Sequence, residues 1–237
     1  SKAVRDEKTK LLRSIRPFQQ GKYGESIIRA QYAAGQDSKG VALPAYRAEQ
    51  GVNPNSQIET YIAAKLFIDN WRWQGVPFFL RSGKRLPKKR SEIAITFKRL
   101  PHSIFAPLKP EDLSPNQLIL NVQPEEGLSL TIQAKQPGPK LCMGSLTMDF
   151  KYANILEEGE SMPEAYERLL LDCMLGDQTL FIRSDAIETA WSLLTPVLKA
   201  WESNAPGCGE LLSYPAGSWG PDIAEKLFDR IDQSWRN

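Results

Sequence analysis

Apolar residues alternate with other residues along the middle of this sequence, and that period of two limits the possible folds more than any other feature. Between residues 92 and 98, Ile93, Ile95 and Phe97 take every second position. The same alternation recurs in residues 118–123, 130–134 and 146–150, and a shorter strand-like segment covers 78–81. Alternation buries one face of a strand and leaves the other face wet or otherwise occupied, which is typical of antiparallel sheets. The sequence therefore predicts a mostly antiparallel sheet in this part of the chain.

Helical signals flank the alternating segments. Capping boxes, in which a Ser or Asp precedes a Glu by three positions, satisfy free amides at the start of a helix. They occur at Ser56 with Glu59, Ser161 with Glu164, and Asp185 with Glu188. We expect the first helix to run through the apolar residues of 58–68 and to end at 75–77, where Gly and Pro stand. Pro221 is expected to open the last helix, and residues 1–15 carry an amphipathic pattern of their own.

The order of these signals predicts an α+β fold class, with a large, mostly antiparallel sheet and helices packed on one face. No repeat, low-complexity tract or Ser/Gly linker divides the sequence, so residues 1–237 are expected to form a single domain. Helices on one face leave the other face of the sheet for solvent or a partner. The amphipathic start has neither a preceding capping residue nor an initiating Met, so we also expect a piece of a longer chain.

The composition excludes several classes of protein. Hydrophobic residues make up 41% and charged residues 24%, which are the proportions of an ordinary soluble domain with a sizeable core. The 30 Lys and Arg nearly balance the 28 Asp and Glu, so net charge gives no sign of a nucleic-acid partner. No apolar run approaches the roughly 18 residues of a membrane-spanning helix. No secretory signal opens the sequence. We expect neither nucleic acid nor membrane as a partner.

The cysteines and the single histidine offer no metal site. Cys142, Cys173 and Cys208 are widely spaced and odd in number, which is typical of reduced thiols in a cytoplasmic protein. A structural zinc site needs four closely spaced ligands, so zinc is excluded. We expect Cys173 in the core and Cys208 exposed, and leave a redox-regulatory role for either open. His102 falls in a predicted exposed loop without an acidic partner for general base catalysis.

Residues 81–90 form the one strongly charged segment, in which six of ten positions are Lys or Arg and none is acidic. The segment falls between two predicted strands, and Gly83 would let a ligand approach the backbone closely. Clustered Lys and Arg suit a phosphate dianion. The alternative is a solvated loop at a sheet edge, which the residues alone favour because runs of charge are usually solvated. The spacing is not that of a nucleotide P-loop, and RNA is a weaker alternative because no aromatic residues interleave the charges.

Several short motifs run along nearly the whole chain. They lie at residues 4–8 (VRDEK), 29–32 (RAQY), 69–73 (DNWRW), 80–86 (LRSGKRL), 122–124 (VQP), 164–169 (EAYERL) and 219–221 (WGP). Together these motifs resemble the glucose-6-phosphate dehydrogenase family. The resemblance is specific because several motifs are long and all of them follow in register.

That family oxidises glucose 6-phosphate to 6-phosphogluconolactone with NADP, in the pentose phosphate pathway of glucose metabolism. An N-terminal Rossmann-type domain binds NADP, and a larger α+β domain completes the substrate pocket and forms the dimer. The resemblance implies that this chain is most of the second domain, of the bacterial type. It also implies that NADP serves the parent enzyme, that none binds to this chain, and that the isolated chain is inactive. The alternatives are a non-catalytic dimerisation or regulator-docking module, and an independent phosphosugar- or RNA-binding protein.

Three residues match substrate contacts of the family. Lys84 matches the lysine of its Arg-x-Gly-Lys motif, Lys89 matches a basic residue five positions later, and Gln123 is the glutamine of Val-Gln-Pro. The resemblance thus favours phosphosugar binding over a merely solvated basic loop, and it leaves Lys88 and Arg90 ambiguous. The catalytic histidines of the family precede the VRDEK motif, so no catalytic residue is expected in this chain.

The resemblance also bears on a second cofactor and on assembly. Some members hold a structural NADP through arginines, and the matching positions here are Ala94, Asn121 and Trp219. We expect that second site to be lost because none of the three carries a guanidinium. In the family the open sheet face pairs with its copy, so we expect a homodimer or homotetramer, with Thr96 and Asn121 suiting a wet interface. A regulatory activator protein stays open as a further partner.

Overall fold

The structure is a computed structural model that describes residues 2–102, 109–110, 113–138, 142–155, 165–230 and 233–237. Its contacts group into two compact units, residues 1–87 with 165–237, and residues 88–164. The α+β class with mostly antiparallel strands is confirmed, although the strands form separate four-stranded sheets and not one large sheet. Helices on a single face are not confirmed, and a single domain over 1–237 stays a prediction.

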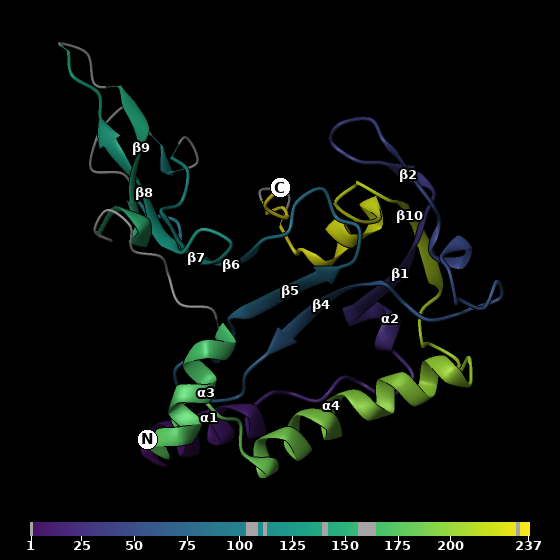
Figure 1. The fold of residues 1–237 in the computed structure, drawn as a ribbon. Helices are drawn as coiled ribbons and strands as arrows, with labels where there is room; N and C mark the ends of the chain where they lie inside the picture. The colour runs from purple at the N-terminus through teal and green to yellow at the C-terminus, as the bar shows by residue number, and fades with distance from the viewer. Residues whose placement is uncertain (1, 103–108, 111–112, 139–141, 156–164, 231–232) are drawn as a thin grey trace. The chain divides into compact units, whose positions relative to one another are not determined.

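The first unit is built on a four-stranded sheet in the order β10-β1-β4-β5 (Figure 1). Its strands are β1 (Ile27–Ala33), β4 (Tyr61–Phe67), β5 (Pro77–Gly83) and β10 (Leu211–Pro215). Among the described strands of this unit, only β1 and β10 pair in parallel. A two-stranded antiparallel ribbon is formed by β2 (Gly35–Gln36) and β3 (Ala42–Leu43). The helical segments are α1 (Lys2–Arg13), α2 (Tyr23–Ser26), η1 (Tyr46–Ala48), α3 (Ala165–Leu175), α4 (Ser184–Glu202) and η4 (Asp222–Leu227).

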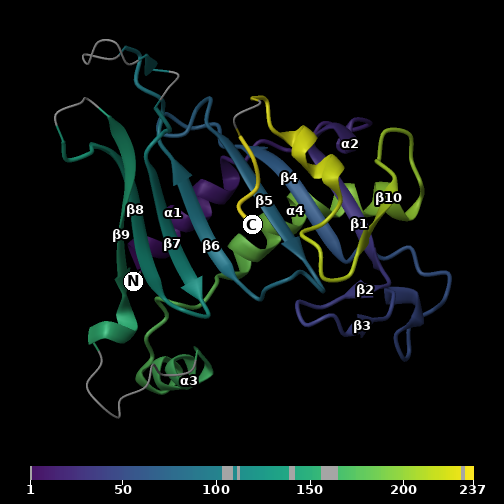
Figure 2. The same ribbon diagram turned by 90° about the horizontal axis from the view of Figure 1, so that it is seen from above.

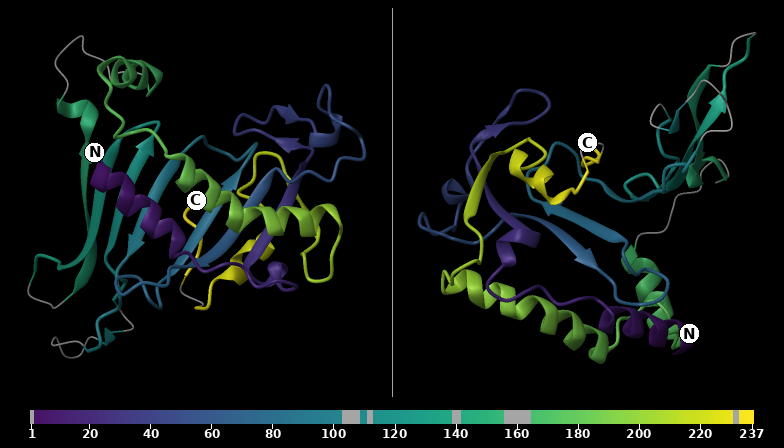
Figure 3. Two further views of the ribbon diagram at one scale, coloured as in Figure 1. Left: turned by 90° about the horizontal axis from the view of Figure 1, so that it is seen from below. Right: turned by 180° about the vertical axis from the view of Figure 1, so that it is seen from behind.

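Both faces of this sheet are buried. On one face, Tyr61 and Tyr214 pack against η4 through Ala224 and Leu227. On the other face, α4 runs across the strands (Figure 3), and Trp201 lies in a cluster with Ile27, Ala64 and Val197. Burying apolar side chains on both faces fixes β1 and β4 as the centre of the unit.

The predicted helix over residues 58–68 is wrong, because this segment is the central strand β4. Its side chains enter both cores: Tyr61 and Ala63 lie in one cluster, and Ala64 lies in the other. A strand buried on both faces has a continuous apolar pattern, which periodicity alone does not separate from that of a buried helix. Ser56 does not cap a helix either, since its hydroxyl accepts a bond from the Ile58 N–H at 3.3 Å.

The second unit is an antiparallel sheet in the order β6-β7-β8-β9, whose strands lie side by side in Figure 2. The strands are β6 (Ser91–Thr96), β7 (Gln117–Gln123), β8 (Gly127–Lys135) and β9 (Met143–Lys151), followed by η3 (Tyr152–Ile155). These strands confirm the alternating segments of the sequence. The strand predicted at 78–81 is also confirmed, as part of β5 in the first unit.

The register of the second sheet separates its side chains into two unlike faces. Leu118 of β7 pairs with Ile95 and Leu130, and Leu130 pairs with Met148, so large apolar side chains share one face. The opposite face is polar, with hydroxyl and amide bonds between neighbouring strands such as Thr131 to Thr147 at 3.0 Å. The apolar face stays open within this unit, where its side chains are exposed by 54% at Ile93, 39% at Ile95, 51% at Leu146 and 47% at Met148.

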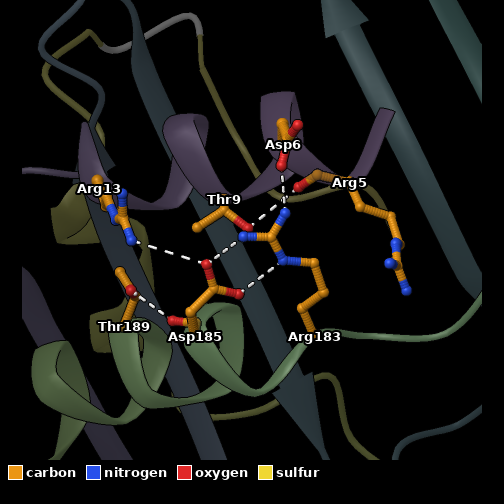
Figure 4. A network of polar contacts seen from close by, with 7 residues as sticks. All are labelled: Arg5, Asp6, Thr9, Arg13, Arg183, Asp185 and Thr189. Carbon is orange, nitrogen blue, oxygen red and sulfur yellow. Dashed lines mark hydrogen bonds and ion pairs between the residues drawn. The ribbon is translucent and has the colours of Figure 1, made fainter. Parts of the chain in front are cut away.

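The amphipathic pattern at the start of the sequence forms α1, which an ionic network ties to the start of α4 (Figure 4). The Arg183 guanidinium donates to the Asp185 carboxylate, with Nε to Oδ1 at 2.9 Å, and it also donates to Asp6 of α1. Arg13 of α1 lies 3.7 Å from the same Asp185 carboxylate. Because α1 has few buried residues, these charged contacts contribute much of what joins it to α4.

The predicted capping box at Asp185 and Glu188 is therefore wrong. Helix α4 begins one residue earlier, at Ser184, and Arg183 in the N-cap position makes no side-chain capping bond. The Asp185 carboxylate accepts hydrogen bonds from the Arg183 guanidinium, so it does not serve mainly to cap the free amides at the start of the helix. Pro221 does precede a helical segment, the 3₁₀ helix η4. The box at 161–164 lies outside the described residues.

Acid is expected to weaken the junction of α1 and α4. Hydrogen bonding from Arg183 holds the pKa of Asp185 below its ordinary value of 3.8. A carboxyl with a depressed pKa stabilises the folded state fully above its unfolded pKa, and this contribution is lost as pH falls through the folded pKa. The difference in urea midpoint between wild type and Arg183→Met should thus be larger at about pH 7 than at about pH 3. Equal differences at both pH values would contradict the assignment.

The two cysteine predictions are reversed in the structure. Cys173 on α3 is exposed, and Cys208 is buried. Cys208 lies in the turn after α4. Its carbonyl accepts a hydrogen bond from the Trp201 Nε1–H at 2.8 Å, which holds the turn against the indole.

No helix in the described part of the chain is long and apolar enough to span a membrane.

Candidate functional site

Lys84 stands on a turn directly after β5, and its backbone is fixed from two sides. The Lys84 N–H donates to the Thr60 carbonyl at 2.8 Å. The Lys84 carbonyl accepts the Tyr214 hydroxyl at 2.6 Å. Tyr214 is only 1% exposed and lies on β10, so a core side chain holds the turn. The turn cannot shift without disturbing the centre of the first unit.

The next residue, Arg85, adds two further bonds to the turn. It has a φ of +52°, and its carbonyl accepts the Gly217 N–H at 2.7 Å. Its guanidinium donates to Glu49 at 2.7 Å, and the same carboxylate oxygen accepts the Tyr32 hydroxyl at 3.1 Å. The hydrogen bond from Arg85, with that from Tyr32, lowers the pKa of Glu49. This carboxylate therefore stays ionised at neutral pH and holds Arg85 in place.

The lysines of residues 81–90 are the cations available to a ligand. Lys84, Lys88 and Lys89 are exposed, and none of their ammonium groups has a hydrogen bond or ion pair within the described residues. An ammonium on a flexible stem acts as a point charge and binds a phosphate without a fixed fork geometry. Three unpaired lysines thus leave positive charge open to solvent.

The arginines of the same segment are engaged within the protein. Arg81 stacks between the rings of Trp219 and Trp235, with centroids 5.0 and 5.1 Å from its guanidinium carbon. Its guanidinium also donates to the Asn237 side chain at 3.2 Å. Arg90 pairs with Glu92 at 3.4 Å. The sequence could not separate these roles, since lysines and arginines mix along the segment.

In the second unit, Gln123 and Lys89 lie at the same end of the paired strands β6 and β7. Gln123 is the last residue of β7 and pairs with Ser91, where a bulge begins. Its Nε2 donates to the Ser91 hydroxyl at 2.8 Å, which orients the exposed amide. Lys89 precedes Ser91 by two residues. Lys84 belongs to the first unit, whereas Lys89 and Gln123 belong to the second.

His102 is exposed, as predicted. Within the described residues, no cluster of three His, Cys, Asp or Glu side chains could hold a metal ion.

Sequence reasoning missed the residues that hold the Lys84 turn. Tyr214 is separated from Lys84 by 130 positions and Glu49 from Arg85 by 36. Neither residue stands in a motif that indicates such a contact. Only a signal of pairing between distant positions could have found them.

Fold and turn together define an α+β domain that presents an unpaired lysine on a fixed turn, an arrangement suited to an anionic ligand. Residues 1–236 match the family model described as glucose-6-phosphate dehydrogenase, C-terminal domain. The chain belongs to this family.

Similar proteins agree with this membership. The chain is 43% identical over 238 residues to the glucose-6-phosphate 1-dehydrogenase of Treponema pallidum, covering 100% of this chain and 45% of the relative. It is 40% identical over 238 residues to that of Rhizobium meliloti, covering 100% of this chain and 47% of the relative. The chain therefore spans about 45% of the length of curated relatives it matches.

A similar solved structure is a glucose-6-phosphate dehydrogenase in complex with its substrate glucose-6-phosphate. It has a TM-score of 0.83 and 31% identity, covering 100% of this chain and 46% of that one. A second is the enzyme of Mycobacterium avium, with a TM-score of 0.75 and 33% identity, covering 98% of this chain and 44% of that one.

Proposed function

We propose that this chain supplies part of the glucose 6-phosphate pocket of an NADP-dependent glucose-6-phosphate dehydrogenase. Lys84 and Lys89 contact the phosphate group, and Gln123 lies beside the sugar. The observation that carries the proposal is the Lys84 turn, with a backbone fixed by Thr60 and Tyr214 and an ammonium left unpaired. The proposal is further supported by the substrate complex among the similar solved structures.

The lysines act by binding and orienting, and the chemistry belongs to the rest of the parent enzyme. NADP bound elsewhere in the parent protein would supply the hydride acceptor for C1 of the sugar, a base would take the C1 hydroxyl proton, and the C1–O bond would become the lactone carbonyl. Charge-assisted bonds to the phosphate would fix the far end of the sugar, which places C1 without taking part in the transfer. A turn that is already rigid loses little entropy when the substrate binds.

The isolated chain is expected to show no dehydrogenase activity, since we propose that base and hydride acceptor lie elsewhere in the parent protein. The test is absorbance of NADPH after mixing pure chain with glucose 6-phosphate and NADP, beside the full-length enzyme as a positive control. NADPH formed by the pure chain at a rate proportional to its concentration would refute the proposal.

The proposal places NADP in the remainder of the parent protein and none on this chain. Ala94, Asn121 and Trp219 stand where some family members use arginines for a structural NADP, and none of them offers a guanidinium. Trp219 instead packs on Arg81. The Arg81 guanidinium carbon also lies 5.1 Å from the ring centroid of Trp235.

We also propose that the polar face of the second sheet pairs with a second copy of the chain, giving a homodimer or homotetramer. Thr96 and Asn121 lie on this face with the hydroxyl and amide groups of β8 and β9. Light scattering on the isolated chain should give twice the monomer mass at concentrations where Asn121→Arg gives the monomer mass. Equal masses for the wild-type chain and Asn121→Arg would exclude this face as the interface between copies.

A non-catalytic docking module is the second candidate function. The open apolar face of the second unit favours it, since exposed apolar patches mark interaction sites. An activator protein is one partner of this kind. For the parent we propose a cytoplasmic enzyme of the pentose phosphate pathway, without nucleic-acid or membrane partners.

A further inference from the structure

A buried arginine without a counter-charge lies on β1 of the first unit. Arg29 is 5% exposed. Its Nε is buried without a hydrogen-bond partner, and its guanidinium forms no hydrogen bond or ion pair within the described residues. The contact that holds it is stacking on Trp201, whose ring centroid lies 5.0 Å from the guanidinium carbon. Burying an unpaired cation is costly, and proteins normally supply an anion or several acceptors.

Arg29 lines a shallow cavity of about 430 Å³ that is open to solvent. The other lining residues come from the segment before β4, from the turn between α4 and β10, and from the first residue of β10: Gln57, Asn204, Ala205, Gly207, Cys208, Gly209, Glu210 and Leu211. The turn is rigid. Gly207 has a φ of +75°, and a Cβ there would lie 1.7 Å from the Gly21 carbonyl oxygen. The backbone wall of the cavity is therefore formed before any ligand enters.

We infer that this cavity binds the carboxylate group of a small metabolite. The planar guanidinium fork matches a carboxylate through two parallel bonds. Arg29 is the one cation of the lining, which balances a monoanion better than a phosphate dianion. The amides of Gln57 and Asn204 add neutral donors and acceptors for the rest of the molecule. Glu210 also lines the cavity, but it is exposed and lies beyond 4.0 Å of the guanidinium.

This site does not share residues with the proposed phosphosugar site. Along β1, Ala30 and Tyr32 point to the face where Tyr214 holds the Lys84 turn. Arg29 points to the opposite face, with Ile27 and Trp201. The inference therefore stands or fails separately from the proposed function.

The test is the NMR signal of the Arg29 Nε–H, which responds to anion binding at the terminal nitrogens of the same guanidinium. The 237-residue chain is titrated with sodium acetate at constant ionic strength, with sodium chloride and inorganic phosphate as comparison anions. The signal is assigned by its loss in Arg29→Leu. We expect acetate to move it downfield with saturation and to raise the melting temperature of the wild type. Chloride and phosphate should do neither.

Arg29→Leu provides a second measurement that does not depend on assignment. Replacing an unpaired buried cation by an apolar side chain should raise the melting temperature without anion and abolish the rise caused by acetate. Glu210→Gln, the matched control in the same cavity, should keep the response. An unsaturable or absent acetate response overturns the inference, as does an equal rise in Arg29→Leu. A saturable response to phosphate alone overturns the assignment to carboxylates.

Discussion

Lys84→Ala in the full-length dehydrogenase is expected to raise KM for glucose 6-phosphate about 10- to 100-fold, with kcat changed much less. A hydrogen bond between charged groups contributes about 1.5–3 kcal/mol, and each 1.4 kcal/mol corresponds to a factor of about ten. If a contact stabilises the bound ground state and the transition state equally, its loss raises KM and leaves kcat unchanged. Lys89→Ala should act in the same direction. Steady-state kinetics with varied substrate and saturating NADP measure both effects.

Lys88→Ala is the matched control for these variants. Lys88 is exposed and unpaired within the described residues, as Lys84 and Lys89 are, and it adjoins Lys89. If the effect came from the general positive charge of the segment, all three variants would raise KM alike. Such a result, or an unchanged KM in Lys84→Ala and Lys89→Ala, would contradict the assignment of the two contacts.

Gly217→Ala should lower the free energy of unfolding by about 2–4 kcal/mol. This sums a backbone cost of about 1 kcal/mol for a side chain at positive φ with about 1–3 kcal/mol for overpacking. Gly217 has a φ of +86°, and a Cβ there would lie 1.8 Å from the carbonyl oxygen of Gln36. Because the neighbour is backbone, it cannot move aside as a flexible side chain would. Urea unfolding of the isolated chain measures the loss.

Gly75→Ala isolates the backbone cost. Gly75 has a similar φ of +77°, but no atom lies within 4 Å of the position of its Cβ. We expect this control to lose about 1 kcal/mol. If both substitutions cost the same, the close approach of Gly217 to Gln36 is not a constraint on the fold.

The Gly217 variant also connects the fold to the candidate site. The Gly217 N–H donates to the Arg85 carbonyl, next to Lys84. A shift of this residue would therefore loosen the turn that presents the Lys84 ammonium. In the full-length enzyme, KM for glucose 6-phosphate should rise in Gly217→Ala and stay unchanged in Gly75→Ala.

The family, and with it the matched lysines, could be recognised from short motifs such as LRSGKRL at residues 80–86. The geometry that makes Lys84 a good candidate for a substrate contact could not be predicted from these motifs. It depends on Tyr214, Thr60 and Glu49, which come from separate parts of the chain. The Arg29 cavity could not be predicted either, because a buried arginine in a strand has the same sequence pattern as a solvated one.

By itself, the sequence determined where the strands of the second unit lie and which side chains share a face. A period of two is a local property, and pleating translates it directly into opposite faces. The tertiary structure alone decided that residues 61–67 form the strand β4, that Cys208 is buried, and that Arg85 is paired with Glu49. Each of these depends on which other segments pack against the residue. Distant segments supply that environment, and local sequence does not encode it.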